Sequence, residues 1–343
     1  MSAETHACGR TAQEIFRDAE KLIDPALVSV VDRLAPVLRE AVHYHYGWAG
    51  KNGRPVTGER GGSGRHLMLF ALLCAGVDGG PAERGLPGAV ADSLAANAGI
   101  IHDDIMDTEV ARRGRPTLHH AYGTVRALMV GDALLGLAFS HLGEHRHPRT
   151  RQALRSLSDS WTGVCAGQTH DVESEGHSEL TLGQAIAVSE AKSGRGVGGT
   201  FRVPVLLTDA CDAQVEAVTQ YGFHLGMAVQ YRNDLLDLWP TNARERVPYG
   251  DIRRRKMTPM VAACLESGHP GSRRLAGYYR AQGDPAEEDL EVIADLIDQC
   301  GGRGWAVEQH REHMRLADQS LRDAGPPPEL YRDLSVLGSH FRS

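Results

Sequence analysis

Apolar residues recur every three to four positions along most of the chain, the pattern of helices that bury one face. This pattern predicts helices at about 65–77, 84–108, 118–143, 148–174, 179–196, 212–239, 256–267, 286–299 and 302–323. Thr11 to about Tyr46 has the same periodicity, and we expect Pro25 to break it because proline removes a helix hydrogen bond. Since no alternating run predicts a strand, the expected fold class is all-α.

The breaks between the predicted helices are short and rich in glycine or proline. Lys51 to Gly64 is a glycine-rich stretch that we expect to be a loop, and Pro326 to Pro328 follows the last predicted helix. Neither a long linker nor an internal repeat interrupts the series. We therefore expect a single domain over residues 1–343, in which residues 1–34 form a divergent N-terminal extension or helix.

Composition narrows the class of protein. The 343 residues are 41% hydrophobic and 24% charged, as in ordinary globular proteins, and the net charge of -7 argues against nucleic-acid binding. The six cysteines are scattered without a CxxC pair, which favours a reducing compartment. The longest apolar stretch, Leu67 to Val77, is shorter than the roughly 20 residues that span a membrane. We therefore expect a cytoplasmic protein without a membrane span.

The first candidate site is the acidic run at Asp103, Asp104 and Asp107. On a helix, Asp103 and Asp107 share a face, with Asp104 beside them. Carboxylates this close repel one another unless cations lie between them, and hard oxygen ligands suit magnesium. A solvated acidic helix end is the alternative interpretation.

A second polar cluster runs from Gln230 to Asp237, where Asn233 and Asp237 again share a helical face. Two such clusters on separate apolar helices resemble the facing clusters that build metal sites in helix bundles. The cations that could meet phosphates are Arg112, Arg113, Lys192 and Lys256.

From about residue 35 to about 340, the order of these motifs resembles that of trans-isoprenyl diphosphate synthases, the polyprenyl synthetase family. Asp103 to Asp107 is similar to the first aspartate-rich motif of the family, and Gln230 to Asp237 is similar to the second. Two further segments are similar to helix starts of the family, Gly131 to Leu135 and Gly167-Gln168 with Asp171. The remaining matches are Arg112-Arg113-Gly114, Lys192-Ser193-Gly194, and Asp251 with Lys256 to Pro259.

The resemblance implies an isoprenoid synthase fold, which is a bundle of antiparallel helices around a central active-site cavity, usually as a homodimer. It also implies a prenyltransferase that ionises an allylic prenyl diphosphate, with three magnesium ions bridging the two acidic motifs and the diphosphate. The implied metal ligands are Asp103, Asp104, Asp107, Asn233, Asp234 and Asp237. The implied catalytic and diphosphate-binding residues are Arg112, Arg113, Gln168, Lys192, Gln230 and Lys256.

The chain departs from the family where the second substrate, isopentenyl diphosphate, is bound. The Gly-Gly-Lys-Arg-x-Arg-Pro segment of the family matches in two places, one with Lys51 and Arg54 and the other with Arg65, about eleven residues apart. Ala96 stands where the family has a histidine, seven residues before the first aspartate. Losing two charged hydrogen bonds would weaken binding by roughly 3–6 kcal/mol.

Three reactions remain open. The leading hypothesis is prenyl transfer to an acceptor other than isopentenyl diphosphate, such as an aromatic or indole-type molecule. The alternatives are ordinary chain elongation to farnesyl or geranylgeranyl diphosphate, and cyclisation by a terpene cyclase of the same fold. By the resemblance, Ala98 and Gly99 line the pocket for the prenyl tail, and their small side chains leave room for donors of C10 to C20.

Overall fold

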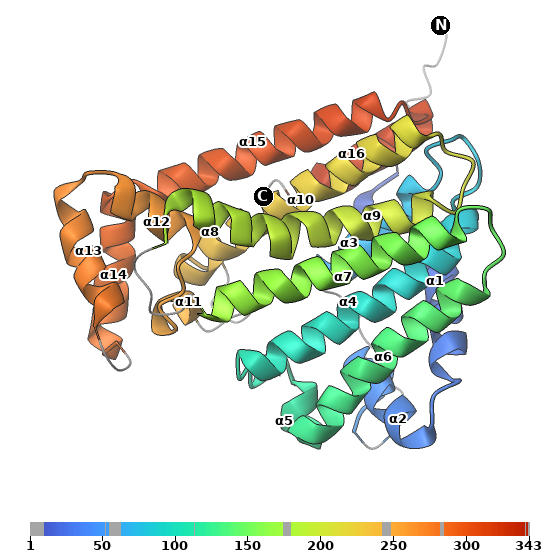
Figure 1. Ribbon diagram of the computed structural model, residues 1–343, viewed down its shortest axis with the longest axis horizontal. Helices are drawn as coiled ribbons and strands as arrows, with labels where there is room; N and C mark the ends of the chain where they lie inside the picture. The colour runs from blue at the N-terminus through green and yellow to red at the C-terminus, as the bar shows by residue number, and fades with distance from the viewer. Residues whose placement is uncertain are drawn as a thin grey trace, which may run out of the picture. The chain divides into compact units, whose positions relative to one another are not determined.

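The computed structural model describes residues 10–51, 53–54, 63–112, 114–173, 180–241, 248–281, 285–339 and 341, with the backbone alone for 63–65 (Figure 1). Its helices are α1 (Ala12–Val31), α2 (Pro36–His45), α3 (Ser63–Cys74), η1 (Ala82–Gly85), α4 (Leu86–Met106), α5 (Leu118–Tyr122), α6 (Thr124–Glu144), α7 (Thr150–Glu173), α8 (Leu182–Ser189), η2 (Glu190–Gly194), α9 (Arg195–Val205), α10 (Asp212–Leu238), α11 (Gly250–Arg253), α12 (Pro259–Glu266), α13 (Pro270–Arg280), α14 (Glu287–Gln299), α15 (Gly302–Asp323) and α16 (Pro328–Ser339). The predicted all-α class is confirmed. Over the described ranges, the strands are two-residue β1 (Ala111–Arg112) and β2 (Arg115–Pro116), which pair antiparallel.

Pro25 does not break the first helix, contrary to the sequence prediction. It lies exposed inside α1, which continues to Val31. Apolar residues on both sides of the proline, including Ile15, Ile23 and Leu27, are buried. Their packing against α3, α4 and α16 outweighs the hydrogen bond that the proline removes. The chain turns only before Pro36, which occupies the first turn of α2, where a missing N–H costs nothing.

Other differences from the prediction also have local causes. Gly123 adopts φ +86° and separates α5 from α6, where one helix was expected. Helices α13 and α16 were missed because their first-turn prolines were taken as loop signals. The two segments predicted as helix starts lie inside helices instead, since Gly131 is within α6 and Gly167 is within α7.

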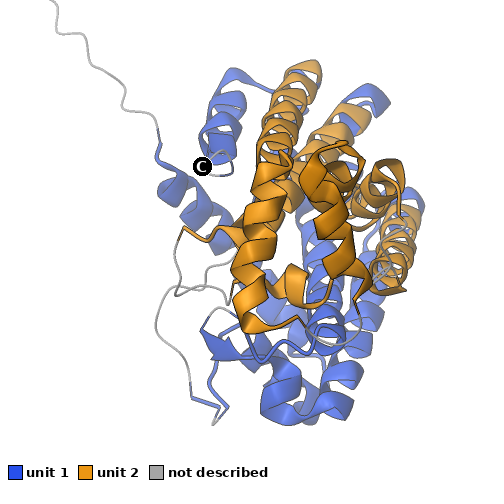
Figure 2. Ribbon diagram, turned by 90° about the vertical axis from the view of Figure 1, so that its left-hand side faces the viewer, with its two compact units in different colours: residues 1–154, 203–215, 324–343 blue, residues 155–202, 216–323 orange. Residues whose placement is uncertain are grey.

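The backbone contacts divide the chain into two compact units (Figure 2). Unit 1 comprises residues 1–154, 203–215 and 324–343, and unit 2 comprises residues 155–202 and 216–323. The boundaries fall inside α7, α9 and α10. The single-domain organisation stays a prediction.

In unit 1, α4 packs along α6 through their apolar faces. Gly131 on α6 permits this approach, because a side chain there would overlap the His102 imidazole on α4. Within the described residues, α6 is the one helix long and apolar enough to cross a membrane, but 39% of its apolar window is buried inside the protein. Packing on α4 therefore accounts for part of its apolar character.

In unit 2, α12, α14 and α15 share an apolar core that includes Met260, Ile293 and Ile297. Elsewhere in the unit, His224 on α10 and His313 on α15 place their Nδ1 atoms 3.0 Å apart, so one imidazole donates to the other. Burial, together with the neighbouring His224, lowers the pKa of His313 to about 4. A neutral histidine pair is therefore part of the contact between the two helices.

We expect acid to destabilise the protein through this pair. The folded His313 protonates near pH 4 and an unfolded histidine near the ordinary 6.5, so the unfolded chain binds more protons between these values. The free energy of unfolding should therefore fall as the pH drops from about 6.5 to about 4, and be unaffected by His313 above that window. His313→Gln should flatten the dependence. Denaturant unfolding at several pH values tests this, with the exposed His120→Gln as the control. The prediction is refuted if the free energy of unfolding of His313→Gln changes with pH as steeply as that of the wild type and of His120→Gln.

Candidate active site

Helix α4 places the first acidic motif in unit 1. Ala96, Gly99, Asp103 and Asp107 lie on one partly exposed stripe of the helix, because they are spaced by three or four residues. Ala98, one residue away from that stripe, is fully buried. The accessible face of α4 therefore joins Ala96 and Gly99 to two of the three metal ligands predicted in the first acidic motif.

The third predicted ligand, Asp104, is buried and bound to Arg112. Both Nε and an Nη of Arg112 approach Asp104 Oδ1 at 2.6 Å. Arg112 lies on β1, and Gly114, with φ +70°, turns the chain back into β2. Burial raises the pKa of Asp104, although Arg112 lowers it. The hairpin thus anchors the arginine to the acidic motif; Arg113 lies outside the described residues.

Other predicted substrate-binding residues lie near the start of the loop after α2. Gly50 donates to the Arg54 carbonyl at 2.8 Å, which closes a turn. Lys51 is exposed, and its Nζ lies 5.5 Å from the ring centroid of Tyr122 on α5. The side chain of Arg65 lies outside the described residues. The structure therefore describes Lys51 and Arg54 of the first match, while the side chains of the second match lie outside the described residues.

A histidine from α2 reaches the neighbourhood of Ala96. The His45 Nε2 atom lies 3.0 Å from Oδ1 of the buried Asn97, which follows Ala96 on α4. The Asn97 amide also donates to the Ser93 carbonyl at 2.8 Å. An imidazole therefore lies beside the position where the family has its histidine, although it comes from another helix.

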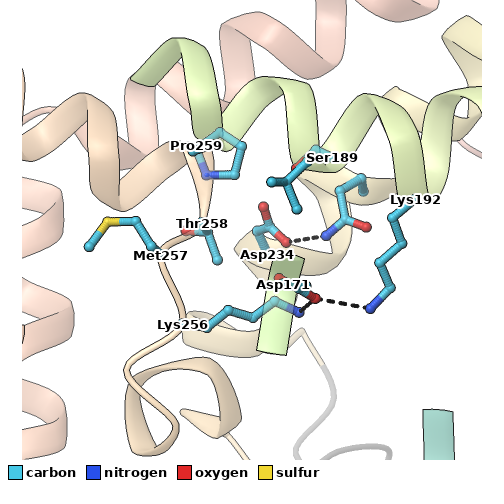
Figure 3. A pocket seen from close by; sticks show the side chains of 11 residues that line it. Asp171, Ser189, Lys192, Asp234, Lys256, Met257, Thr258 and Pro259 are labelled. Carbon is cyan, nitrogen blue, oxygen red and sulfur yellow. Dashed lines mark hydrogen bonds and ion pairs between the residues drawn. The ribbon is translucent and has the colours of Figure 1, made fainter. Parts of the chain in front are cut away.

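Unit 2 holds a small cavity at the predicted diphosphate-binding lysines (Figure 3). The lining residues are Asp171, Ala185, Val188, Ser189, Lys192, Gln230, Asp234, Lys256, Met257, Thr258 and Pro259. Lys192 Nζ and Lys256 Nζ lie 3.1 and 2.8 Å from the same Asp171 oxygen, Oδ2. Burial lowers the pKa of Lys256, but the Asp251 and Asp171 carboxylates raise it by more, so the net shift is upward and Lys256 is cationic.

Gln230 connects the second acidic motif to the lysine segment. Its amide donates to Asp234 Oδ1 at 2.7 Å, and its carbonyl oxygen accepts from Ser193 at 2.6 Å. The other Asp234 oxygen, Oδ2, is buried without a hydrogen-bond partner in the described part of the chain, as is Gln168 Oε1. Burial, with Asp251 adding to it, raises the pKa of Asp234.

Asp237, one of the implied metal ligands, accepts hydrogen bonds at the start of a neighbouring helix. Its two carboxylate oxygens accept from the backbone N–H groups of Gly250 and Asp251, at 3.2 and 2.9 Å, where α11 begins. These bonds satisfy donors of the first turn of a helix. Asn233, one turn earlier on α10, is partly exposed.

Two glycines fix the backbone at Lys192. The lysine lies in η2, a π-helical turn between α8 and α9, and such turns are often found at functional sites. A side chain at Gly167 on α7 would lie 2.8 Å from the Lys192 backbone nitrogen, and one at Gly226 on α10 would overlap the Ser193 carbonyl. Helices α7 and α10 can therefore approach the turn closely only because both positions are glycine.

Whether these residues fit magnesium depends on unsatisfied oxygen atoms. Asp234 Oδ2 is a buried carboxyl oxygen without a hydrogen-bond partner in the described residues, and burial raises the pKa of the group because its charged form is costly there unless it is paired. A hard cation would satisfy it. In the described ranges, no group of three or more His, Cys, Asp or Glu side chains is already arranged around a metal position. The donor chemistry thus fits magnesium, while metal binding by the six implied ligands stays a prediction.

Two polar contacts were not among the predicted site residues. Asp171 and Ser193 were noted only as parts of family motifs, yet Asp171 pairs with both lysines and Ser193 bonds to Gln230. The spacing of Gln168 and Asp171 placed them on one face of a helix, which was the available signal. Their partners come from distant segments, which the spacing could not reveal.

Acidic residues and lysines that helices place around a cavity are typical of an all-helical enzyme that binds an anionic substrate. The family model for polyprenyl synthetase matches residues 35–297. The chain is 33% identical to the (2E,6E)-farnesyl diphosphate synthase of Mycobacterium tuberculosis, over 94% of this chain and 90% of that protein. It is 30% identical to the geranylgeranyl diphosphate synthase of the same organism, over 89% and 87%.

Solved structures agree with the sequence comparisons. A polyprenyl synthetase from Streptomyces coelicolor matches with a TM-score of 0.88 and 29% identity, over 97% of this chain and 100% of that chain. A geranylgeranyl pyrophosphate synthetase from Pyrococcus horikoshii matches with a TM-score of 0.82 and 26% identity, over 96% and 98%. The chain therefore belongs to the polyprenyl synthetase family of prenyltransferases. The predicted isoprenoid synthase fold is confirmed.

We expect Gly167→Ala to impair the site, and Gly163→Ala, one turn earlier on α7, to spare it. The new methyl group at position 167 would press on the Lys192 backbone, whereas position 163 has no neighbouring atom within 4 Å. Overpacking should lower the free energy of unfolding by roughly 1–3 kcal/mol, while Gly163→Ala should raise it by about 0.4–1 kcal/mol. Denaturant unfolding and prenyltransferase assays of both variants test this. Equal activity in the two variants would show that Gly167 does not position Lys192.

Proposed function

We propose that the protein is a chain-elongating prenyl diphosphate synthase that joins an allylic prenyl diphosphate to isopentenyl diphosphate. The observation that carries the proposal is the pair of cationic lysines, Lys192 and Lys256, at one cavity beside Gln230 and Asp234. Two ammonium groups that point to the same place suit a diphosphate, because a diphosphate has several anionic oxygens that can accept from them. The similarity to farnesyl and geranylgeranyl diphosphate synthases over about nine-tenths of the chain supports the same reaction.

The lysines act on the leaving group. Lys192 and Lys256 bind the diphosphate of the allylic substrate and stabilise the charge that develops as the carbon–oxygen bond breaks. Arg112, oriented by Asp104, supplies a further cation on unit 1. Magnesium, when bound by the acidic motifs, neutralises the diphosphate and acts as a Lewis acid. Gln230 orients the Asp234 carboxylate through its amide.

The acceptor half of the proposed reaction, which is the binding of isopentenyl diphosphate, has separate support. Lys51 and Arg54 are exposed cations in the segment that resembles the isopentenyl diphosphate site of the family, and His45 contacts Asn97, the residue that follows Ala96. The relatives favour chain elongation over the hypothesis of an aromatic acceptor, although Ala96 and the extended loop motivated that hypothesis. The terpene cyclase alternative has no observation in its favour. Donor length between C10 and C20 and a cytoplasmic location stay predictions.

A homodimer is part of the proposal. Val125, Leu128 and Met129 on α6 are 77%, 39% and 51% exposed, which makes an apolar face on a helix that packs with its other side against α4. Exposed apolar patches of this kind mark interfaces with other proteins. A second copy of this chain covers this face in the proposed assembly, because symmetric pairs are the commonest oligomers.

The proposed reaction predicts a product five carbons longer than the donor. Purified protein with magnesium, isopentenyl diphosphate and geranyl or farnesyl diphosphate should give the elongated diphosphate by mass spectrometry. Asp103→Ala should lower turnover by a factor on the order of a hundred or more, because it removes a carboxylate that would hold magnesium at the leaving group. Asp295→Ala, an exposed carboxylate on α14, is the control. A prenylated indole as the main product when indole is added beside isopentenyl diphosphate, or a cyclic hydrocarbon from the donor alone, would contradict chain elongation.

The proposed interface predicts that charge on α6 separates the subunits. Leu128→Glu combined with Met129→Glu should shift the mass measured by light scattering from dimer to monomer, since both charges would be buried against the second copy. Val110→Glu places the same charge on an exposed valine outside α6, 59% exposed, and should leave the mass unchanged. A wild-type monomer, or a dimer that survives the double substitution, would refute this interface.

A further inference from the structure

Asp171 is the point where three segments of unit 2 meet. It lies near the end of α7 with a side chain that is only 12% exposed. Lys192 comes from η2, Lys256 comes from the segment before α12, and both ammonium groups reach the same oxygen, Oδ2 (Figure 3).

Electrostatics makes this carboxylate necessary for the arrangement. Because both Nζ atoms contact one oxygen, the two positive charges are close neighbours and repel each other. Their side chains are largely buried, so water screens the repulsion poorly. Burial raises the pKa of Asp171, but Lys256 and Lys192 lower it by more, so the carboxylate is ionised. Asp171 is therefore the carboxylate that both lysines contact, while Asp251 adds negative charge near Lys256.

The cavity is too small for a diphosphate in this arrangement. It encloses about 10 Å³, which is the space of about one water molecule, whereas pockets for small ligands hold roughly 300–1,000 Å³. The two ammonium groups donate to Asp171 along its edge. Each ammonium group has three N–H donors, so a diphosphate that binds to the lysines shares them with the Asp171 oxygen, whose negative charge offsets part of their attraction for it.

We propose that Asp171 is a positioning residue that holds Lys192 and Lys256 together before the substrate binds and competes with the diphosphate for their ammonium groups. This inference rests on the proposed function, in which the two lysines bind the diphosphate. Asp171 has two effects in opposite directions. It places the lysines correctly for the leaving group, and it weakens the binding of the diphosphate product, which favours product release.

The isosteric variant Asp171→Asn separates these effects from a merely structural role. It removes the competing charge and keeps the shape of the side chain, so inorganic diphosphate should bind more tightly, by a factor on the order of ten. Turnover should fall, because the repelling lysines lose their spacing and the product leaves slowly. KM and kcat should thus decrease together. A purely structural role would weaken diphosphate binding or leave it unchanged.

The probe is inorganic diphosphate, titrated calorimetrically into the full chain with and without magnesium. Asp159→Asn removes the same charge from an exposed position on α7 and should bind the probe as the wild type does. Asp171→Glu keeps the charge and should restore weaker, wild-type-like binding. Affinity for the probe that is unchanged or reduced in Asp171→Asn would overturn the proposal.

A second comparison keeps the test decisive if Asp171→Asn does not fold. Lys192→Gln and the double variant Lys192→Gln with Asp171→Asn differ only in the charge of Asp171 beside Lys256. The double variant should bind inorganic diphosphate more tightly than Lys192→Gln alone, and equal or weaker binding would again overturn the proposal. Because binding is measured without turnover, a wild type that binds as expected but elongates no prenyl diphosphate would refute the proposed function and not the role of Asp171.

Discussion

Two lysines of unit 2 can remain side by side only because a buried carboxylate lies between them. Asp171 Oδ2 contacts the ammonium groups of Lys192 and Lys256 at 3.1 and 2.8 Å, and the elements around it are arranged to keep those distances. Gly167 and Gly226 let α7 and α10 close on the π-helical turn that carries Lys192. Tight packing, not a flexible loop, thus sets the position of the charge that would meet a leaving diphosphate.

The same constraint explains what the sequence could and could not predict. Helical periodicity located most helices, and the spacing of Asp103 and Asp107 predicted that they share the accessible face of α4. The pairing of Asp171 with two lysines depends on residues 21 and 85 positions away, and no local pattern contains that information. Pro25 was misjudged for a related reason, because burial of Ile15, Ile23 and Leu27 by other helices overrides a local helix breaker.

The two halves of the proposed reaction, binding of the allylic donor and binding of the isopentenyl acceptor, are supported unequally. The donor half rests on Lys192, Lys256 and the Asp104–Arg112 pair, each with contacts in the structure. The acceptor half rests on Lys51 and Arg54, which are exposed at the start of a loop, and on relatives that are farnesyl and geranylgeranyl diphosphate synthases. The hypothesis of an aromatic acceptor arose because Ala96 replaces an expected histidine. His45, beside Asn97, shows that tertiary structure can bring an imidazole to the same neighbourhood from another helix.

The central claim is that release of the leaving diphosphate is coupled to the use of isopentenyl diphosphate. The most direct measurement is the stoichiometry of the two in one reaction, followed with geranyl or farnesyl diphosphate as the donor and magnesium present. The account predicts one diphosphate released for each isopentenyl diphosphate consumed, and little release when isopentenyl diphosphate is omitted. Equal rates of release with and without isopentenyl diphosphate would contradict it, since the prenyl group would then be passing to water, to another acceptor or to its own double bond.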